Sequence, residues 1–114
     1  MKYRVISDYQ SPYPNPLVFH GGDSVIVGKE FEGDPEWSGW VWCKGLRGVK
    51  AWAPKSYLNI NGEEGVFIRN YNARELSVKR GEYLVVKEIL GGFGMAEKPD
   101  GDTGWVPMKV LEKC

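Results

Sequence analysis

The chain has 114 residues and is 42% hydrophobic, which suits one domain or two very small ones. Its 15 lysines and arginines balance its 15 aspartates and glutamates, so the formal net charge is zero. This balance argues against bulk nucleic-acid binding, which depends on neutralising phosphates, and it gives no support for a membrane surface as a partner.

The N-terminus and the cysteines point to a cytoplasmic location. Residues 1–9 lack the apolar core and cleavage site of a signal peptide, and no segment approaches the length of a transmembrane helix. Cys43 and Cys114 define no disulfide framework, as is usual in a reducing compartment. The chain has only one histidine besides, so no metal site is expected.

Short β-rich runs follow one another along the chain, separated by glycine, proline and other turn residues. They are residues 3–6, 24–27, 39–43, 66–68, 83–86 and 103–106. No window of about ten residues shows a convincing helical period. The sequence therefore predicts an all-β fold of short strands, as in a small barrel or sandwich.

A first pair of segments indicates that one unit occurs twice. Residues 17–27 match residues 76–86 in their apolar, glycine and acidic positions. The two acids, Asp23 and Glu82, each follow a glycine where a strand begins. A turn at that place needs a carboxylate acceptor or a glycine dihedral angle.

A second pair of segments sets the extent of the two copies. Residues 51–58, AWAPKSYL, align with residues 104–111, GWVPMKVL. We therefore expect two domains, at residues 1–60 and 65–114, joined by a short polar linker at 61–64. A linker of this length leaves the copies little independent movement, so they are expected to touch.

Alternation within the predicted strands separates small side chains from large rings. Trp40 and Trp42 share one face of their strand, while Val41 and Cys43 share the other. Small or branched side chains suit the inside of a small barrel. The tryptophan rings are therefore expected to lie outside it.

A series of motifs occurs in the same order in both copies, and this order is typical of Src-homology-3 (SH3) domains. In the first copy the motifs are residues 5–9, 17–23, 40–43 and 51–58. In the second copy they are residues 67–71, 75–82, 93–96 and 104–111. The chain resembles a tandem pair of SH3 domains, similar to small prokaryotic proteins of this kind. The resemblance implies two tandem SH3-like small β-barrels.

The same resemblance implies a groove for proline-rich peptides, which lie across aromatic ridges as preformed polyproline II helices. By position, the ligand-binding residues of the first copy are Tyr9, Trp40, Trp52, Pro54 and Tyr57. Ser7 stands where the family usually has a tyrosine, so one ring wall of a proline pocket is missing.

The second copy matches the groove less well. By position it offers Tyr71, Phe93, Trp105 and Pro107. Arg69 and Val110 stand where tyrosines are usual, and Phe93 replaces the tryptophan. Its first loop is also too short to form an overhanging wall. We therefore expect a degenerate groove in the second barrel.

Acidic residues also depart from the family pattern, in which acids on the first loop hold a basic residue of the ligand. Residues 10–19 contain no acid, and the acids lie on the other flanking loop instead: Glu30, Glu32, Asp34 and Glu36. Two interpretations stay open for them. They either select a basic ligand or line a solvated hairpin loop.

Aromatic residues are concentrated in the first copy, which holds ten of the 15 tryptophan, tyrosine and phenylalanine residues. This excess indicates either an exposed interaction patch or a seam between the two copies. The proline-rich run at residues 11–16 forms a stiff loop or serves as a ligand for another copy, which would give self-association.

No catalytic constellation emerges, since a lone histidine supplies neither a triad nor a histidine-rich metal site. The sequence therefore predicts a non-enzymatic module without a cofactor that binds protein or peptide, through the groove of the first barrel. The alternative is a structural or assembly subunit whose aromatic patch is covered by a partner protein or by the second barrel.

Overall fold

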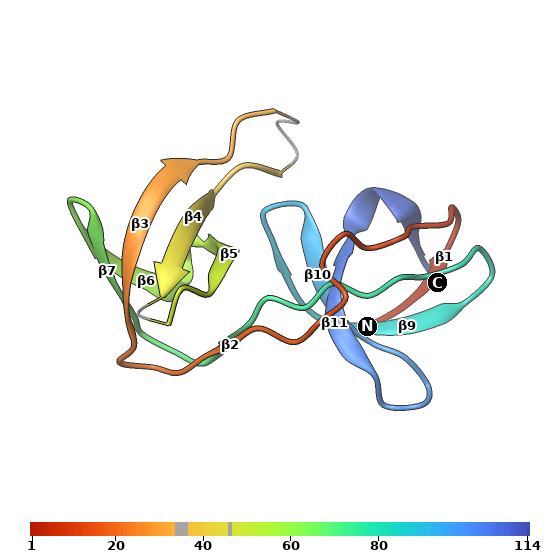
Figure 1. Ribbon diagram of the computed structural model, residues 1–114. Helices are drawn as coiled ribbons and strands as arrows, with labels where there is room; N and C mark the ends of the chain where they lie inside the picture. Colours follow the sequence, from red (N-terminus) through yellow and green to blue (C-terminus); the bar gives the residue numbers. More distant parts are fainter. Residues whose placement is uncertain (34–36, 46) are drawn as a thin grey trace. The chain divides into compact units, whose positions relative to one another are not determined.

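The structure is a computed structural model that describes residues 1–33, 37–45 and 47–114. Nearly all of its regular elements are β-strands, which form two five-stranded sheets and one two-stranded sheet (Figure 1). The strands are β1 Lys2–Val5, β2 Val18–Phe19, β3 Ser24–Glu30, β4 Trp40–Gly45, β5 Lys50–Pro54, β6 Leu58–Asn61, β7 Glu64–Phe67, β8 Tyr71–Asn72, β9 Tyr83–Leu90, β10 Phe93–Glu97, β11 Thr103–Pro107 and β12 Leu111–Lys113. Single 3-10 turns follow β5 and β11, η2 at Lys55–Tyr57 and η3 at Met108–Val110. The predicted all-β class is confirmed.

In the described part of the chain, no helix is long and apolar enough to cross a membrane.

The chain divides into two compact units that do not follow the sequence repeats. Unit 1 comprises Met1–Asn15 together with Arg74–Cys114, and unit 2 comprises Pro16–Ala73. The sheet of unit 1 has the strand order β11-β10-β9-β1-β12, and that of unit 2 has the order β5-β4-β3-β7-β6. Since β9 to β12 are the repeat counterparts of β3 to β6, the two sheets have the same architecture. The predicted domains at 1–60 and 65–114 describe the sequence repeats, and this division stays a prediction.

The first strand of each repeat lies in the sheet of the other repeat. Strand β1 lies between β9 and β12, with Tyr3 opposite Leu84 on one side and Lys113 on the other. Strand β7 lies between β3 and β6, with Gly65 opposite Val25. In Figure 1 the red strand β1 accordingly lies beside the blue-green strand β9. Each unit is therefore completed by a strand from the other repeat.

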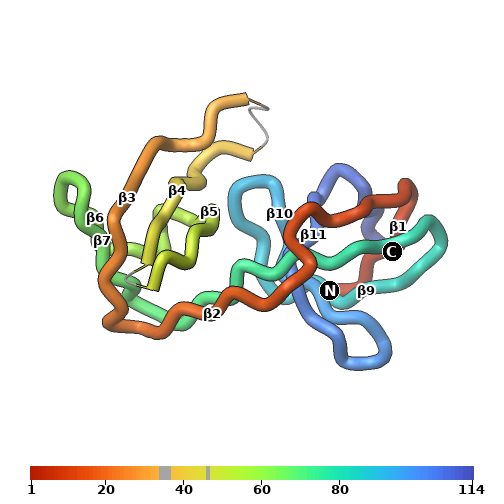
Figure 2. Tube along the Cα trace, in the orientation of Figure 1, coloured from red at the N-terminus to blue at the C-terminus, as the bar shows by residue number. Residues whose placement is uncertain are grey.

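The segments that follow the exchanged strands are exchanged with them. In unit 2, β2 pairs with β8, and Phe19 lies opposite Tyr71. Figure 2 shows the orange-red segment around β2 running beside the green segment that contains β8. In unit 1, Tyr9 and Val78 form an isolated bridge. The exchange thus reaches beyond the strands into the loops that carry predicted site residues.

Alternation along β4 and β5 places small side chains inside unit 2, as the sequence predicted. Val41, Cys43, Ala51 and Ala53 are each at most 4% exposed. Burial raises the pKa of the Cys43 thiol to about 11, so this thiol is protonated and packs as a small apolar group at neutral pH. On the opposite face, Trp42 is only half-buried.

Equivalent turns precede β3 and β9. The Asp23 carboxylate accepts a hydrogen bond from the His20 backbone N–H at 2.8 Å, and Glu82 accepts the equivalent bond at 2.6 Å. Gly22 and Gly81, which precede these acids, both have a φ of 95°, a left-handed conformation that glycine adopts readily. Both turns thus use the carboxylate acceptor and the glycine dihedral angle that the sequence predicted.

The core of unit 1 draws on both parts of that unit. Its buried side chains are Tyr3, Val5, Leu76, Val78, Leu84, Val86, Ala96, Val106, Val110 and Leu111. Tyr3 and Val5 belong to β1, and Val5 is 1% exposed. Burying a large apolar side chain contributes roughly 1.5–3 kcal/mol, so β1 is an integral part of this core.

Candidate functional site

The residues predicted to bind ligand are distributed over both units. Of the first set, Trp40, Trp52, Pro54 and Tyr57 lie in unit 2, whereas Tyr9 lies in unit 1. Of the second set, Phe93, Trp105 and Pro107 lie in unit 1, whereas Tyr71 lies in unit 2. Tyr9 and Tyr71 each follow the first strand of their repeat. Because that strand lies in the sheet of the other repeat, each tyrosine lies there too.

Tyr71 joins the first set of site residues, in the place predicted for Tyr9. Its hydroxyl donates a hydrogen bond to the backbone carbonyl of Trp52 at 2.6 Å. Its ring packs edge-on against Tyr57, with ring centroids 5.4 Å apart. The second repeat therefore supplies Tyr71 to the aromatic residues of the first.

Four buried rings form what we call the inner ring stack of unit 2: Phe19, Tyr57, Phe67 and Tyr71. The Phe19 and Phe67 centroids are 4.7 Å apart, and those of Phe67 and Tyr71 are 5.8 Å apart. The Arg69 guanidinium lies over the Tyr57 ring, 4.2 Å from its centroid, which is a cation–π contact. None of the four rings is more than 4% exposed, so the stack belongs to the core.

Trp40 and Pro54 are also buried. They lie opposite each other in the β4–β5 pair, and Trp40 is 7% exposed. Of the five residues predicted for the first groove, Trp52 and Tyr9 are therefore the two that are only half-buried. The other three, Trp40, Pro54 and Tyr57, are buried.

A second group of four rings, which we call the outer ring cluster, is half-buried: Phe31, Trp37, Trp42 and Trp52. Trp42 and Trp52 lie opposite each other in β4 and β5, with centroids 5.1 Å apart. Phe31 packs edge-on against Trp52 at 5.4 Å and contacts Trp37 at 6.2 Å. These contacts hold four part-exposed rings together on one surface of unit 2.

Gly28 of β3 lies beside Trp42 of β4. A Cβ added to Gly28 would come within 3.6 Å of Trp42 Cδ1 and 3.4 Å of the Trp42 carbonyl oxygen. These are ordinary van der Waals distances, so the indole of Trp42 lies beside the backbone of β3 and next to Trp52.

Three members of the outer ring cluster, Phe31, Trp37 and Trp42, are not among the predicted site residues. Alternation put Trp42 on the same face as Trp40, and this was the signal that could have found it. The position of Phe31 follows from an irregularity in the β3–β4 pairing between Val27 and Glu30, for which the sequence holds no signal.

Acidic side chains lie near this cluster in the chain. Glu30 and Glu32 are exposed, and Glu30 accepts a hydrogen bond from Lys55 Nζ at 2.6 Å. Exposed ion pairs of this kind contribute about 1 kcal/mol or less, so Glu30 can exchange its partner at little cost. The other two acids of the sequence prediction, Asp34 and Glu36, lie outside the described residues.

The counterpart site in unit 1 is built around a partly buried carboxylate. The Tyr9 hydroxyl donates a hydrogen bond to Glu75 Oε1 at 2.6 Å. Desolvation by burial raises the pKa of the Glu75 carboxyl, and burial, with Glu75 beside it, raises the pKa of Tyr9. Phe93 lies opposite Pro107 in the β10–β11 pair, and Trp105 is 1% exposed. The residues of the predicted second groove are mostly buried.

Next to this carboxylate, Arg74 holds the chain segments of unit 1 together. Its guanidinium binds Asp102 through two hydrogen bonds of 2.5 and 3.1 Å, and its Nε donates to the Pro14 carbonyl at 3.0 Å. The hydrogen bonds from Arg74 hold the pKa of the Asp102 carboxyl below its usual range. Asp102 therefore contributes stability that is lost as the pH falls through its lowered pKa.

Replacing Glu75 by glutamine is expected to change how stability depends on pH. The pKa of Glu75 is higher in the folded state than in the unfolded state. Its contribution to the free energy of unfolding is therefore fully present below the unfolded-state pKa and is lost as the pH rises through the folded-state pKa. Glu75→Gln avoids this loss, while the amide oxygen still accepts the Tyr9 hydrogen bond. At pH 7 the variant should equal the native protein or exceed it by up to about 1 kcal/mol.

Urea unfolding of both proteins between about pH 4 and pH 7 measures this difference. The difference in stability between the two proteins should shrink as the pH falls. Asp102 is present in both proteins, so its effect does not enter this difference. A variant that is less stable than the native protein at pH 7, by the same amount at every pH, would contradict the expectation.

The outer ring cluster has the chemistry of a binding surface. Flat tryptophan rings pack against proline rings and other apolar groups, and indole N–H groups donate to peptide carbonyls. In the part of the chain that the structure describes, no group of three or more histidine, cysteine, aspartate or glutamate side chains could hold a metal ion.

Comparison with known protein families gives a match in both repeats. A family model described as the variant SH3 domain matches residues 2–61 and again residues 65–114. The matched segments coincide with the two sequence repeats and together span nearly the whole chain. Comparisons with curated proteins and with solved structures gave no match.

Proposed function

The chain belongs to the variant SH3 domain family as a tandem pair, and on this premise we propose that it binds proline-rich or extended peptide segments through the outer ring cluster. SH3 domains are typically protein-binding modules and are usually non-catalytic. The predicted tandem resemblance is confirmed at this level, and the ligand is the step that we add.

One observation carries the proposal: the four half-buried rings of the outer ring cluster contact one another on a single unit. Large aromatic side chains dominate the energetics of many interfaces because they bury much area at little entropic cost. The contacts among Phe31, Trp42 and Trp52 already fix the rings, so little ordering would accompany binding. Trp40, Pro54, Tyr57 and Tyr71 support this surface from within unit 2.

The nearby acids add a preference to the proposal. Glu30 and Glu32 are exposed, and they favour a ligand with a lysine or arginine beside its prolines. Such charges mostly raise the association rate and select among partners. Binding should therefore weaken as the salt concentration rises, because salt screens these charges. Contacts with the rings alone would depend less on salt.

The experiment that tests the proposal is an NMR titration with a short proline-rich peptide that contains one arginine. The indole Nε1–H signals of Trp42 and Trp52 are expected to shift. The signal of Trp105 should stay in place, because this ring is 1% exposed in unit 1. A peptide with alanines in place of its prolines is the matched ligand control.

A variant locates the binding surface. Trp42→Ala is expected to weaken binding about tenfold while cooperative unfolding is retained, since this ring is only half-buried. Tyr83→Ala removes an exposed ring from unit 1 and should leave binding unchanged. Absence of any indole shift at about 1 mM peptide would reject the proposal.

A structural or assembly role is the second candidate, and the burial of Trp40 and Tyr57 favours it. Rings that are 7% and 4% exposed serve stability more directly than docking. Trp40→Ala separates the two functions. A loss of about 3–5 kcal/mol in the free energy of unfolding supports the structural role of this ring. Loss of binding with full stability supports a role in the groove.

The free cysteines and the proline-rich run refine the proposal. Cys43 is buried and Cys114 is exposed, and an exposed free thiol supports the proposed cytoplasmic location. Within the run, the Ser11 N–H donates to Ser77 Oγ, and the Tyr13 N–H donates to Ser11 Oγ. These bonds support the interpretation as a stiff loop, so self-association through this run is not part of the proposal.

A further inference from the structure

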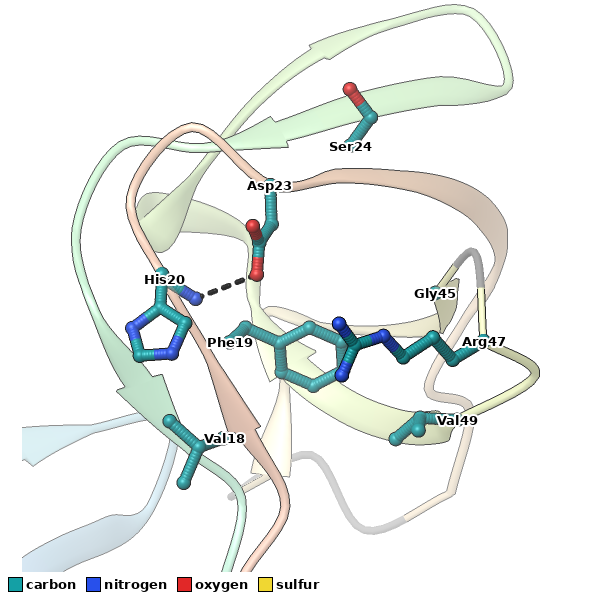
Figure 3. A pocket seen from close by; sticks show the side chains of 8 residues that line it. All are labelled: Val18, Phe19, His20, Asp23, Ser24, Gly45, Arg47 and Val49. Atoms are coloured by element: carbon teal, nitrogen blue, oxygen red, sulfur yellow. Dashed lines mark hydrogen bonds between the residues drawn. The ribbon is translucent and has the colours of Figure 1, made fainter.

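Unit 2 contains a pocket that shares no residue with the outer ring cluster. Its volume is about 390 Å³, within the range of sites that hold small ligands or the end of a peptide. It is lined by Val18, Phe19, His20, Asp23, Ser24, Gly45, Arg47 and Val49 (Figure 3). These residues come from β2, the turn before β3 and the start of β3, and from the end of β4 and the residues between β4 and β5.

The floor of the pocket is apolar and rigid. Phe19 is 4% exposed, and its ring stacks on Phe67 with centroids 4.7 Å apart. A Cβ at Gly45 would lie 3.4 Å from Phe19 Cε1, so the backbone of Gly45 packs closely beside this ring. Val18, which is 53% exposed, and the half-buried Val49 add apolar walls.

A cation and a carboxylate flank this floor. Figure 3 shows the Arg47 side chain extending from the β4–β5 turn toward Phe19, and the Asp23 carboxylate above Phe19 in this view, beside His20. Among the described residues Arg47 forms no ion pair, so its guanidinium keeps its donors for a ligand. Asp23 Oδ2 accepts the His20 N–H, and the second carboxylate oxygen remains as an acceptor.

Backbone hydrogen bonds join the described residues on either side of Arg47. The Gly45 N–H donates to the Val49 carbonyl at 2.7 Å, and the Gly48 N–H donates to the Gly45 carbonyl at 3.0 Å. Gly48 has a φ of 78°, which a glycine adopts without strain. The base of the Arg47 side chain therefore has a defined position relative to the apolar floor.

We infer that this pocket binds an apolar group that ends in a free carboxylate, with an amide N–H beside it. The guanidinium of Arg47 matches a carboxylate through two parallel hydrogen bonds. The apolar group lies against Phe19, Val18 and Val49, and the amide N–H donates to Asp23. The C-terminal residue of a protein has this chemistry, and so has an N-acylated amino acid.

The test is a titration of the isotope-labelled protein with a short peptide that ends in leucine with a free carboxylate. The backbone signals of residues 20–24 and 47–49 are expected to shift. The same peptide with a C-terminal amide should bind about tenfold or more weakly, because it lacks the charged partner of Arg47. Equal binding of the acid and the amide would overturn the inference.

Arg47→Gln should weaken binding of the free acid by a similar factor, whereas Lys50→Gln should not. Lys50 is an exposed lysine of β5 that does not line the pocket, so it controls for a general loss of positive charge. Unchanged binding in Arg47→Gln would overturn the inference.

N-acetyl-leucine distinguishes an N-acylated amino acid from a protein C-terminus as the ligand. Affinity equal to that of the peptide supports a small acid, and weaker affinity supports a protein C-terminus.

The indole signals distinguish this site from the proposed function. Binding in the pocket should leave Trp42 and Trp52 unmoved, since neither lines it. If the leucine peptide shifts these indoles and spares residues 20–24 and 47–49, the inference fails while the proposed groove stands. If a proline-rich peptide gives no shift but the leucine peptide shifts the pocket, the inference stands alone.

Discussion

A fragment of residues 16–73 is expected to fold by itself, whereas a fragment of residues 1–61 is expected to stay unfolded. The first fragment contains all five strands of the sheet of unit 2. The second lacks β7 and with it Phe67, which is 1% exposed and stacks on Phe19. Each such side chain contributes roughly 1.5–3 kcal/mol, a large share of the stability of so small a domain.

The N-terminal strand cannot replace β7 in the fragment 1–61 without a clash. In equivalent registers, Tyr3 of β1 lies opposite Leu84, and Gly65 of β7 lies opposite Val25. A Cβ at position 65 would already come within 2.7 Å of Val27 Cγ2. A tyrosine at this place would displace the neighbouring strand. The first repeat is therefore expected to fail as an independent barrel.

NMR dispersion and thermal unfolding of both fragments measure this prediction. The matched control is residues 74–114 joined to 1–15 by a short glycine–serine linker, which restores unit 1 as one chain. The Cys114 N–H donates to the Lys2 carbonyl at 3.1 Å, so the ends to be joined lie close together. If residues 1–61 fold cooperatively and residues 16–73 do not, the repeats fold as continuous domains and the exchange is absent in solution.

Replacing Gly104 by alanine is expected to lower the free energy of unfolding by about 3 kcal/mol, because the added methyl overpacks the core of unit 1. A Cβ there would come within 2.9 Å of Leu76 Cγ and 3.0 Å of the Arg74 carbonyl oxygen. The backbone has little freedom to relax. Leu76 N–H donates to the Trp105 carbonyl at 3.0 Å, and Trp105 N–H donates to the Arg74 carbonyl at 2.9 Å.

Urea unfolding of Gly104→Ala beside Gly21→Ala measures this effect. Gly21 has ordinary surroundings, with Arg69 Cα as the nearest atom at 3.6 Å, so its replacement should change stability by less than about 0.5 kcal/mol. A loss below about 1 kcal/mol for Gly104→Ala would show that the neighbouring strand gives way. The m-values should stay equal if only the folded state is affected.

The same position illustrates why repeat alignment is a poor guide to packing. Gly104 aligns with Ala51, and the sequence treats the two residues as interchangeable small side chains. Ala51 fits unit 2 at 3% exposure, whereas in unit 1 the space beside Gly104 is taken by Leu76 and its backbone. The difference arises from a residue almost thirty positions away, which no local pattern reveals.

The part of the candidate site that could be predicted from the sequence depends on local patterns. Alternation placed Cys43 inside and Trp42 outside, and motif order identified Trp52. The position of Tyr71 beside Tyr57 was not predictable, since it depends on which repeat supplies a distant segment. Phe31 was missed for a similar reason, because an irregular pairing between β3 and β4 positions it.

The sequence alone determined the all-β class, the two copies, their motifs and the two carboxylate turns, because each is set by alternation or by a few neighbouring residues. Only the tertiary structure decided which first strand completes which sheet. Strands β1 and β7 have similar alternation and take equivalent places, so their own patterns do not choose between the sheets. Side-chain size decides which strand enters which sheet. Beside Val27 only a glycine such as Gly65 fits, whereas the sheet of unit 1 has room to bury Tyr3.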